Sequence, residues 1–271
     1  MIRSKFRKLL GSKDEWPMPK ISGQEPHFLF IVTPPYSGST ALAAILQSSP
    51  HVASLQERAE GQWLIPELSA ADRWKPNKYI DYESVRRVWL ARAAQIKTEQ
   101  KDVKVIVEKS PPNMVRLGKL IERFASYSLL ANNRNPYANI SSLSVRVGNA
   151  DQSESERLEQ LSFLAKRWVE RSELIQSLIS QYKMNLITYE QFCANPEILL
   201  AMLNLPKGIA ETVVTDQEIS IKGQELKPLV NYNQKQISLL SAKEIEVISD
   251  VLQNHQKLLT FFGYELQIQK K

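Results

Sequence analysis

The sequence predicts an α/β fold with a doubly wound, mainly parallel central sheet flanked by helices. Short apolar segments typical of strands alternate along the chain with long amphipathic segments typical of helices. Strands that are separated by helices pair in parallel through right-handed crossovers. Each strand-like segment also ends in polar residues, and ligands of such folds bind at the carboxyl ends of the strands. A ligand site is therefore expected at one edge of the sheet.

Four segments are predicted to be strands of this sheet. Each is a short apolar run bounded by polar or turn-forming residues, as in strands that are buried on both faces. In chain order they are residues 28–33, 103–109, 126–134 and 184–190. The polar groups at or just after their carboxyl ends are Ser37-Gly38-Ser39-Thr40, Glu108-Lys109, Arg134-Asn135 and Tyr189-Glu190.

Three long segments are predicted to be helices, because their apolar residues recur at roughly the spacing of one helix face. They are residues 82–97, 157–182 and 242–262. Residues 1–26 read as a polar lead-in with prolines at positions 17, 19 and 26. Residues 27–271 are predicted to form one domain, since the chain is short enough for a single large α/β unit.

Composition narrows the class of protein. Hydrophobic residues make up 43% of the 271 residues and charged residues 24%, which is ordinary for a globular protein. No apolar run approaches the roughly 20 residues of a membrane span, and no signal peptide is evident. The net charge of +6 suits an anionic ligand, but the positive residues are too dispersed to indicate nucleic acid. The single cysteine, Cys193, excludes an intrachain disulfide and favours a reducing, cytoplasmic setting.

The segment after the first strand is predicted to bind an anion. Pro34-Pro35 ends the strand, and Tyr36-Ser37-Gly38-Ser39-Thr40 leads into a helical run. Free backbone N–H groups and the helix dipole favour negative charge at such a helix start. Gly38 allows the backbone to approach a phosphate closely, and Ser37, Ser39 and Thr40 add hydroxyl donors. A nucleotide phosphate is the expected ligand.

The loop differs from that of P-loop kinases and NTPases. Their motif, G-x-x-x-x-G-K-[ST], supplies a lysine to the terminal phosphates and a hydroxyl to Mg²⁺. The stretch TPPYSGST lacks both the first glycine and that lysine. A P-loop kinase or NTPase therefore remains only as an alternative.

TPPYSGST instead resembles the 5′-phosphosulfate loop of sulfotransferases that use PAPS (3′-phosphoadenosine 5′-phosphosulfate), commonly P-[RK]-S-G-[ST]-[ST]. Arg134-Asn135-Pro136, followed by Ser142, resembles the segment of the same family that clamps the 3′-phosphate. Arg146 lies one helical turn beyond Ser142, so both can face one anion. The resemblance implies the P-loop NTPase-like sulfotransferase fold, PAPS as co-substrate, PAP as product and no metal.

Three further stretches carry the resemblance, which covers residues 27–266 and is closest in style to bacterial and protein-tyrosine sulfotransferases. EKSPPN (108–113) implies that Lys109 stabilises the transferred group, and TYEQFCANPEILL (188–200) implies that Tyr189 contacts the adenine. The third stretch is the closing segment that ends in FFGYE. Lys222 and Lys227 lie in a polar segment similar to the loop that closes over the 3′-phosphate.

One position departs from the family pattern, and the base is open to alternatives. Tyr36 stands where members usually carry an arginine or lysine that stabilises charge on the bridging oxygen. The stretch SSPHVASLQERAEGQWLIP (48–66) resembles the region after the loop helix in the protein-tyrosine branch, where a glutamate 21 residues after the basic position is the base. The resemblance implies that Glu57 is the base here. Glu60 and His51 are the alternatives.

The predicted function is sulfuryl transfer from PAPS to a hydroxyl or amine of a small-molecule acceptor, by in-line displacement with a general base. Residues 59–101 are expected to line the acceptor side. A catalytically impaired PAP-binding protein is a further alternative, because Tyr36 removes the usual charge of the loop. A homodimer is compatible with the sequence.

Overall fold

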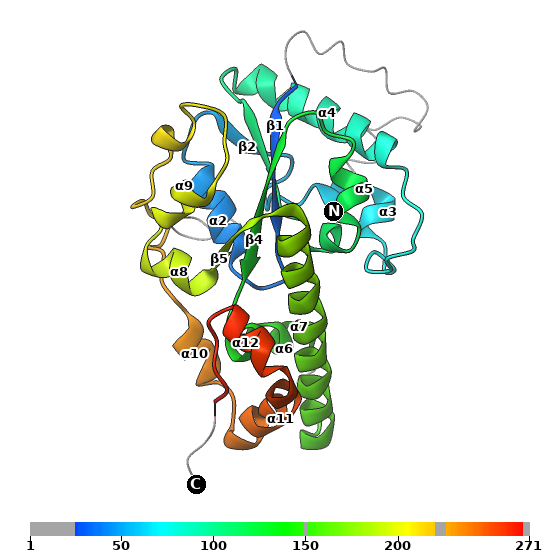
Figure 1. Ribbon diagram of the computed structural model, residues 1–271, viewed down its shortest axis with the longest axis vertical. Coiled ribbons are helices and arrows are strands. Elements are labelled where there is room, and N and C mark those ends of the chain that lie inside the picture. Colours follow the sequence, from blue (N-terminus) through cyan, green and yellow to red (C-terminus); the bar gives the residue numbers. More distant parts are fainter. Residues whose placement is uncertain (1–24, 149–150, 220–225, 268–271) are drawn as a thin grey trace.

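Five parallel strands form one sheet in the order β2-β3-β1-β4-β5 in the computed structural model, which describes residues 25–148, 151–219 and 226–267 (Figure 1). The strands are β1 (His27–Val32), β2 (Val52–Ser54), β3 (Val105–Glu108), β4 (Tyr127–Asn133) and β5 (Asn185–Thr188). Every neighbouring pair is parallel. The predicted α/β sheet and its four predicted strands are confirmed. The edge strand β2 was not predicted, because three residues are too few to show a pattern.

The helices of the described residues alternate with the strands and then follow them. They are α2 (Ser39–Leu46), α3 (Pro66–Ser69), α4 (Tyr82–Glu99), α5 (Leu117–Ile121), α6 (Pro136–Val147), α7 (Glu154–Tyr182), α8 (Tyr189–Ala194), α9 (Ile198–Met202), α10 (Asn233–Ile237), α11 (Ala242–Leu252) and α12 (Gln256–Phe261). Short 3-10 turns are η2 (Gly61–Leu64), η3 (Pro111–Arg116), η4 (Ala210–Thr212) and η5 (Gln253–His255). No helix in the described ranges is both long and apolar enough to cross a bilayer.

Helix starts follow from capping residues. The Asp81 side chain accepts hydrogen bonds at the start of α4, and capping boxes begin α7 at Ser153 and α11 at Ser241. The predicted helix over 242–262 is divided into α11 and α12 by the turn η5. Asn254 and His255, which are weaker helix formers than leucine or lysine, lie in that turn.

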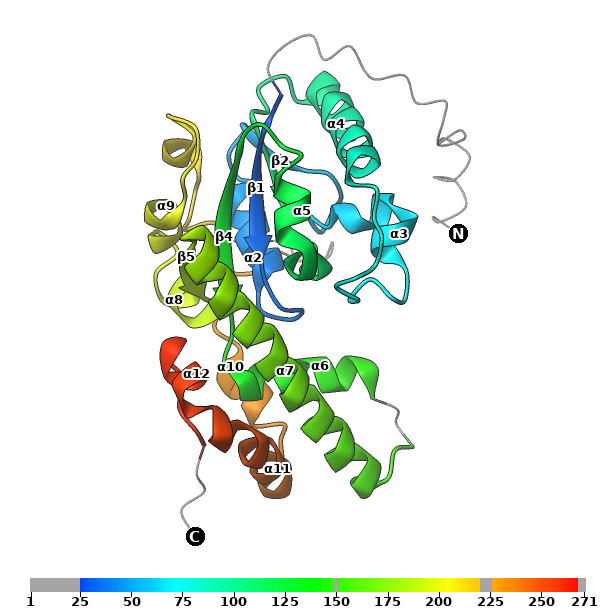
Figure 2. The ribbon, with the colours of Figure 1, turned by 45° about the vertical axis from the view of Figure 1, so that its right-hand side comes forward.

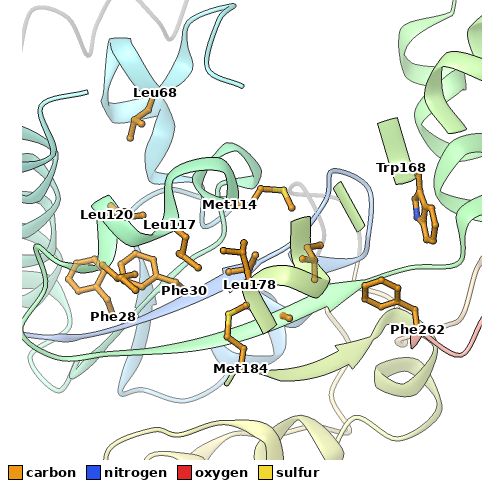
Figure 3. Packing of buried hydrophobic residues seen from close by; sticks show 14 of the residues in the cluster. Phe28, Phe30, Leu68, Met114, Leu117, Leu120, Trp168, Leu178, Met184 and Phe262 are labelled. Atoms are coloured by element: carbon orange, nitrogen blue, oxygen red, sulfur yellow. The ribbon is translucent and has the colours of Figure 1, made fainter. Parts of the chain in front are cut away.

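Alternate residues of β1 face opposite sides of the sheet, as the two-residue period of a strand requires. Phe28 and Phe30 lie beside Leu117 and Leu120 of α5 (Figure 3). The same cluster includes side chains of α4 and α7, and Phe262, which follows α12. Leu29 and Ile31 pack in a second cluster with side chains of α2, α8 and α9. Both faces of the sheet are therefore covered by helices, which confirms the doubly wound arrangement.

A group of helices lies beyond the carboxyl ends of the strands. Figure 2 shows α7 running from the sheet into this group, which contains α6, α10, α11 and α12. The long helix packs against α6, α11 and α12, and α6 packs against α10. The loops that leave the strands at this edge therefore face α6 and α7. Residues 1–24 of the predicted lead-in lie outside the described residues, so the domain boundary stays a prediction.

Candidate active site

The loop after β1 has the backbone shape of an anion cradle. Tyr36 has φ 64° and Gly38 has φ 82°, so both lie in the left-handed region. Gly38 precedes α2 and provides no side-chain cap, while its carbonyl accepts from the N–H groups of Ala41 and Leu42. The first N–H groups of α2 are left for a ligand, as at any helix start. The predicted strand, loop and helix start are confirmed.

Asn139 of α6 holds this loop in place. Its Nδ2 donates to the Pro35 carbonyl at 2.9 Å and to the Ser37 hydroxyl at 3.2 Å. Ser37 is fully buried, so its hydroxyl faces the protein and does not line the site. The sequence analysis does not identify Asn139 as a site residue. Its position one helical turn after the cap residue Asn135 is the sequence feature that points to it.

Tyr189, the first residue of α8, packs directly on the loop. A Cβ added to Gly38 would lie 2.3 Å from Cδ2 of the Tyr189 ring, so only glycine fits there. The tyrosine hydroxyl donates to the Val230 carbonyl at 2.9 Å and accepts from the Tyr232 N–H at 3.1 Å. The ring is 5% exposed, which leaves little of it for an adenine. The predicted adenine contact stays a prediction.

Arg134 lies at the carboxyl end of β4 and is held by three partners. Its guanidinium stacks on the Tyr189 ring at 4.3 Å, Nε donates to Asn233 Oδ1 at 2.9 Å, and Nη1 donates to the Tyr36 carbonyl at 3.1 Å. The third nitrogen, Nη2, is buried and has no hydrogen-bond partner in the described part of the chain. Burial lowers the pKa of Arg134, and the side chain is 6% exposed. An unmatched, fixed N–H donor therefore stands beside the anion loop.

Glu60 and Lys109 form an ion pair at the ends of two other segments. Lys109 follows β3 and donates from Nζ to Glu60 Oε1 at 2.9 Å. Glu60 Oε2 accepts from Gln62 Nε2 and from Trp63 Nε1, each at 2.8 Å. Burial acts to raise the pKa of Glu60, but the Lys109 charge and these hydrogen bonds hold it below its usual value. Glu60 is therefore an oriented carboxylate, and Lys109 is its buried ion-pair partner.

Glu108, the last residue of β3, fixes the two segments that carry this pair. Its Oε2 accepts from the Gly61 N–H at 2.6 Å, and its Oε1 accepts from the Ser110 N–H at 2.8 Å and from Asn113 Nδ2 at 3.1 Å. Burial raises the pKa of Glu108 to about 7, against the hydrogen bonds from Ser110 and Gly61. From the sequence, Glu108 is predicted only to be a polar residue at the end of a strand.

Tyr36, Gly38, Glu60, Lys109 and Arg134 line one pocket of about 1170 Å³ at the carboxyl edge of the sheet, facing α6 and α7. The volume exceeds that of most sites for one drug-sized ligand and leaves room for two molecules side by side. Eleven of the candidate site residues from the sequence line it: Tyr36, Gly38, Ser39, Thr40, Glu60, Lys109, Arg134, Ser142, Arg146, Tyr189 and Lys227.

Comparison with known proteins decides the family. A family model described as "Sulfotransferase family" matches residues 26–203, which is more than half of the chain. This chain belongs to the sulfotransferase family. No curated protein matches it.

Two solved structures show that the sulfotransferase fold is shared. A sulfotransferase of Mycobacterium avium is 12% identical with a TM-score of 0.51, and the match covers 97% of this chain and 82% of that one. A sulfotransferase of Alicyclobacillus acidocaldarius is 13% identical with a TM-score of 0.50, covering 90% of this chain and 98% of that one. The family that the two phosphate motifs indicated is thereby confirmed.

The remaining predicted residues of this sulfotransferase lie elsewhere. Glu57 is exposed and is not among the residues that line the pocket, whereas the alternative Glu60 is. His51 precedes β2 and its Nδ1 bonds to the Asp102 carbonyl at 2.9 Å, at the opposite edge of the sheet. Lys222 lies outside the described residues. Within the described ranges, no three His, Cys, Asp or Glu side chains form a group able to hold a metal ion.

Proposed function

We propose that this sulfotransferase transfers the sulfuryl group of PAPS to a hydroxyl or amine of a small-molecule acceptor and releases PAP. The observation that carries the proposal is the buried Nη2 of Arg134, which has no acceptor among the described residues and belongs to a side chain lining the same pocket as the loop 36–40. A buried donor left unmatched costs about 1–3 kcal/mol, so an anion that binds it is favoured. A nucleotide with separate 5′- and 3′-phosphates fits two anion sites in one pocket.

Each anion site has its own residues. The backbone at Gly38, with Ser39 and Thr40, would bind the 5′-phosphate end, since these residues form the start of α2. Arg134, Ser142 and Arg146 would bind the 3′-phosphate from the end of β4 and from α6. Lys227 lines the same pocket and would contribute to this second site. The two groups are tied together, because Arg134 Nη1 already donates to the Tyr36 carbonyl.

Glu60 and Lys109 would be the catalytic residues. PAPS supplies the sulfuryl group, so a bond forms between the acceptor oxygen or nitrogen and sulfur while the sulfur–oxygen bond to the 5′-phosphate breaks. Lys109 would bind the sulfuryl oxygens, because its ammonium is buried in the pocket wall. Glu60 would orient the acceptor and take its proton. When Lys109 turns to the sulfuryl group, the carboxylate loses its counter-charge and becomes a better base.

Tyr36 replaces the basic residue that the loop of other family members usually carries. Its side chain brings no cation to a position where a basic residue is usual, so the charge on the leaving oxygen would be stabilised by Lys109 and by the α2 start alone. This feature favours one second candidate, a PAP-binding protein with little or no turnover. The cytoplasmic setting and the homodimer stay predictions.

The test is a binding measurement with a matched control. Titration calorimetry with PAP is carried out on the wild type, Arg134→Ala, Arg134→Lys and Arg123→Ala, the last at an exposed arginine outside the pocket. We expect about tenfold to hundredfold weaker binding for Arg134→Ala, because hydrogen bonds to charged groups contribute about 1.5–3 kcal/mol. Unchanged affinity in both Arg134 variants would remove the 3′-phosphate assignment.

Two parallel measurements separate the alternatives. ATP with Mg²⁺ binding in place of PAP would favour the kinase interpretation. Transfer of labelled sulfate from PAPS to any acceptor in a screen would support the enzyme, whereas tight PAP binding without transfer would support the impaired PAP-binding protein.

A further inference from the structure

We propose that the acceptor is an anionic molecule with an apolar body, whose acidic group is bound by Arg58, Arg73 and Arg171. The proposal rests on the proposed function, because it names the acceptor class of that same site. It is carried by the charges of the pocket, by an arginine stacked on a tryptophan in its wall, and by the apolar side chains that line the same pocket.

The pocket carries more positive charge than the nucleotide accounts for. Its lining residues include seven cations and a single carboxylate: Arg58, Arg73, Lys109, Arg134, Arg146, Arg171, Lys227 and Glu60. Arg134, Arg146 and Lys227 are assigned to the nucleotide, and Lys109 is paired with Glu60. Arg58, Arg73 and Arg171 remain, and none of the three forms an ion pair with a carboxylate in the described ranges. Unpaired cations around one pocket favour an anionic ligand.

Arg171 is held at the carboxyl edge of the sheet by its neighbours on α7. Trp168, one turn earlier, donates from Nε1 to the Arg134 carbonyl at 3.1 Å, and Ser172 accepts from Asn133 Nδ2 at 3.0 Å. The Arg171 guanidinium stacks on the Trp74 ring at 4.5 Å. Burial, with repulsion from a neighbouring arginine on α7, lowers the pKa of Arg171 to about 10, so the group stays charged at neutral pH but is poorly solvated.

The segment that carries Arg73 and Trp74 is also fixed. The buried guanidinium of Arg116, at the end of η3, donates to the Arg73 carbonyl at 2.7 Å and to the Lys75 carbonyl. Its Nε donates to the Tyr82 hydroxyl at 3.0 Å. Since α7 also packs against η3, the two walls that bear Arg73 and Arg171 are joined through one scaffold. The Arg73 guanidinium is itself held by a hydrogen bond from Nη1 to the Ala70 carbonyl at 3.1 Å. Guanidinium groups that are fixed in this way bind a carboxylate, sulfate or phosphate with little loss of entropy.

Apolar side chains line the same pocket as these cations and the catalytic pair. Trp63 is 48% exposed although it lines the pocket, and its Nε1 bonds to Glu60. Val145 and Val147 of α6 also line the pocket and are 68% and 55% exposed. Apolar groups exposed around a concave site are typical of ligand-binding surface. An acceptor with its hydroxyl at Glu60 would cover this surface and extend its acidic group to the arginines.

The experiment compares acids with their neutral amides. The enzyme–PAP complex is titrated by calorimetry with three pairs, in which 4-hydroxyphenylacetate, 6-hydroxy-2-naphthoate and 12-hydroxydodecanoate are each matched with the corresponding carboxamide. At least one acid is expected to bind about tenfold more tightly than its amide, as hydrogen bonds to a charged group are stronger. The difference is expected to shrink at high salt, because screening weakens partly exposed charge pairs.

Three variants locate the acidic group. Arg171→Gln and Arg73→Gln are expected to remove the preference for the acid while PAP affinity is kept. Arg58→Gln tests the third cation. The Arg58 side chain is exposed, so its replacement is expected to leave the fold intact. The control is Arg123→Gln, at an exposed arginine that follows α5 and does not line the pocket. It is expected to retain the preference.

The results that would overturn the acceptor proposal differ from those that would overturn the proposed function. If the wild type binds PAP but no acid in the three pairs binds more tightly than its amide, the acceptor proposal is overturned while the proposed function stands. The same holds if all three arginine variants keep the preference. Failure of the wild type to bind PAP would instead overturn the proposed function.

Discussion

Replacing Gly38 by alanine tests whether the contact with Tyr189 shapes the anion loop. The added Cβ would lie 2.3 Å from Cδ2 and 2.8 Å from Cε2 of the ring, at a residue with φ 82°. The ring cannot move cheaply, since its hydroxyl is bonded to the Val230 carbonyl and the Tyr232 N–H and its face to Arg134. Gly38→Ala is therefore destabilised in two ways, by the left-handed backbone at this residue and by the steric clash with the Tyr189 ring.

A second glycine isolates the clash. Gly208 has the same φ of 82°, but a Cβ there would meet no atom within 4 Å in the part of the chain that the structure describes. Gly208→Ala is expected to cost about 1–2 kcal/mol, the penalty of a left-handed backbone for an alanine. Gly38→Ala is expected to cost about 1–3 kcal/mol more from overpacking. The entropy lost by the unfolded chain on gaining a Cβ is common to both variants and cancels in the comparison.

The assay is urea unfolding of both variants, followed by titration with PAP. Gly38→Ala is expected to be the less stable of the two and to bind PAP at least about tenfold more weakly, because the amides of the loop are displaced from their orientation. Gly208→Ala is expected to bind PAP as the wild type does. Equal stability losses, together with unchanged PAP affinity of Gly38→Ala, would refute the reasoning.

Three further predictions follow from side-chain contacts. Glu60→Gln is expected to lower kcat by roughly 10²–10⁴, as for a general base, with PAP affinity retained, while Glu57→Gln stays near wild type in the same sulfate-transfer assay. Asn139→Ala should lower the free energy of unfolding by about 1–3 kcal/mol, because the Ser37 hydroxyl and a loop carbonyl lose their donor; urea unfolding measures it. Glu108 titrates near 4.5 when unfolded and at about 7 when folded, so the folded state holds more protons between these values and stability falls as pH rises through this window. In Glu108→Gln, the free energy of unfolding is expected to decrease by about 3 kcal/mol less between pH 4.5 and pH 7 than in the wild type. An unchanged pH dependence would contradict the assignment of this decrease to Glu108.

The parts of the site that sequence alone found are those encoded by contiguous residues. The loop 36–40 was found because a strand, a glycine and a helix start follow one another directly, and backbone geometry makes such a sequence an anion cradle. Arg134 was found because a strand end and a helix N-terminus adjoin in the same way. The edge strand β2 and the break between α11 and α12 were missed, because short or weakly patterned segments depend on what packs against them.

Tertiary structure alone separated Glu60 from Glu57. Both stand at similar distances from the loop along the chain, and only the fold turns Glu60 toward Lys109 and leaves Glu57 exposed. Ser37 is a similar case: its hydroxyl faces Asn139, 102 residues later, and does not line the pocket. Positions one to three residues apart on an irregular loop can point in opposite directions, so spacing cannot choose between them.

The sequence by itself determined the parallel sheet, because the alternation of strand and helix patterns is a property of neighbouring residues. It predicted a ligand site at one edge of that sheet and, by resemblance to a family, two phosphate motifs. The tertiary structure decided which side chains share the pocket. It left Arg134 Nη2 without a partner in the described part of the chain, and it set Arg171 against Trp74, residues almost a hundred positions apart. The physical reason is that burial and charge pairing are set by what the packed chain brings together, and these decide which groups are free to bind a ligand.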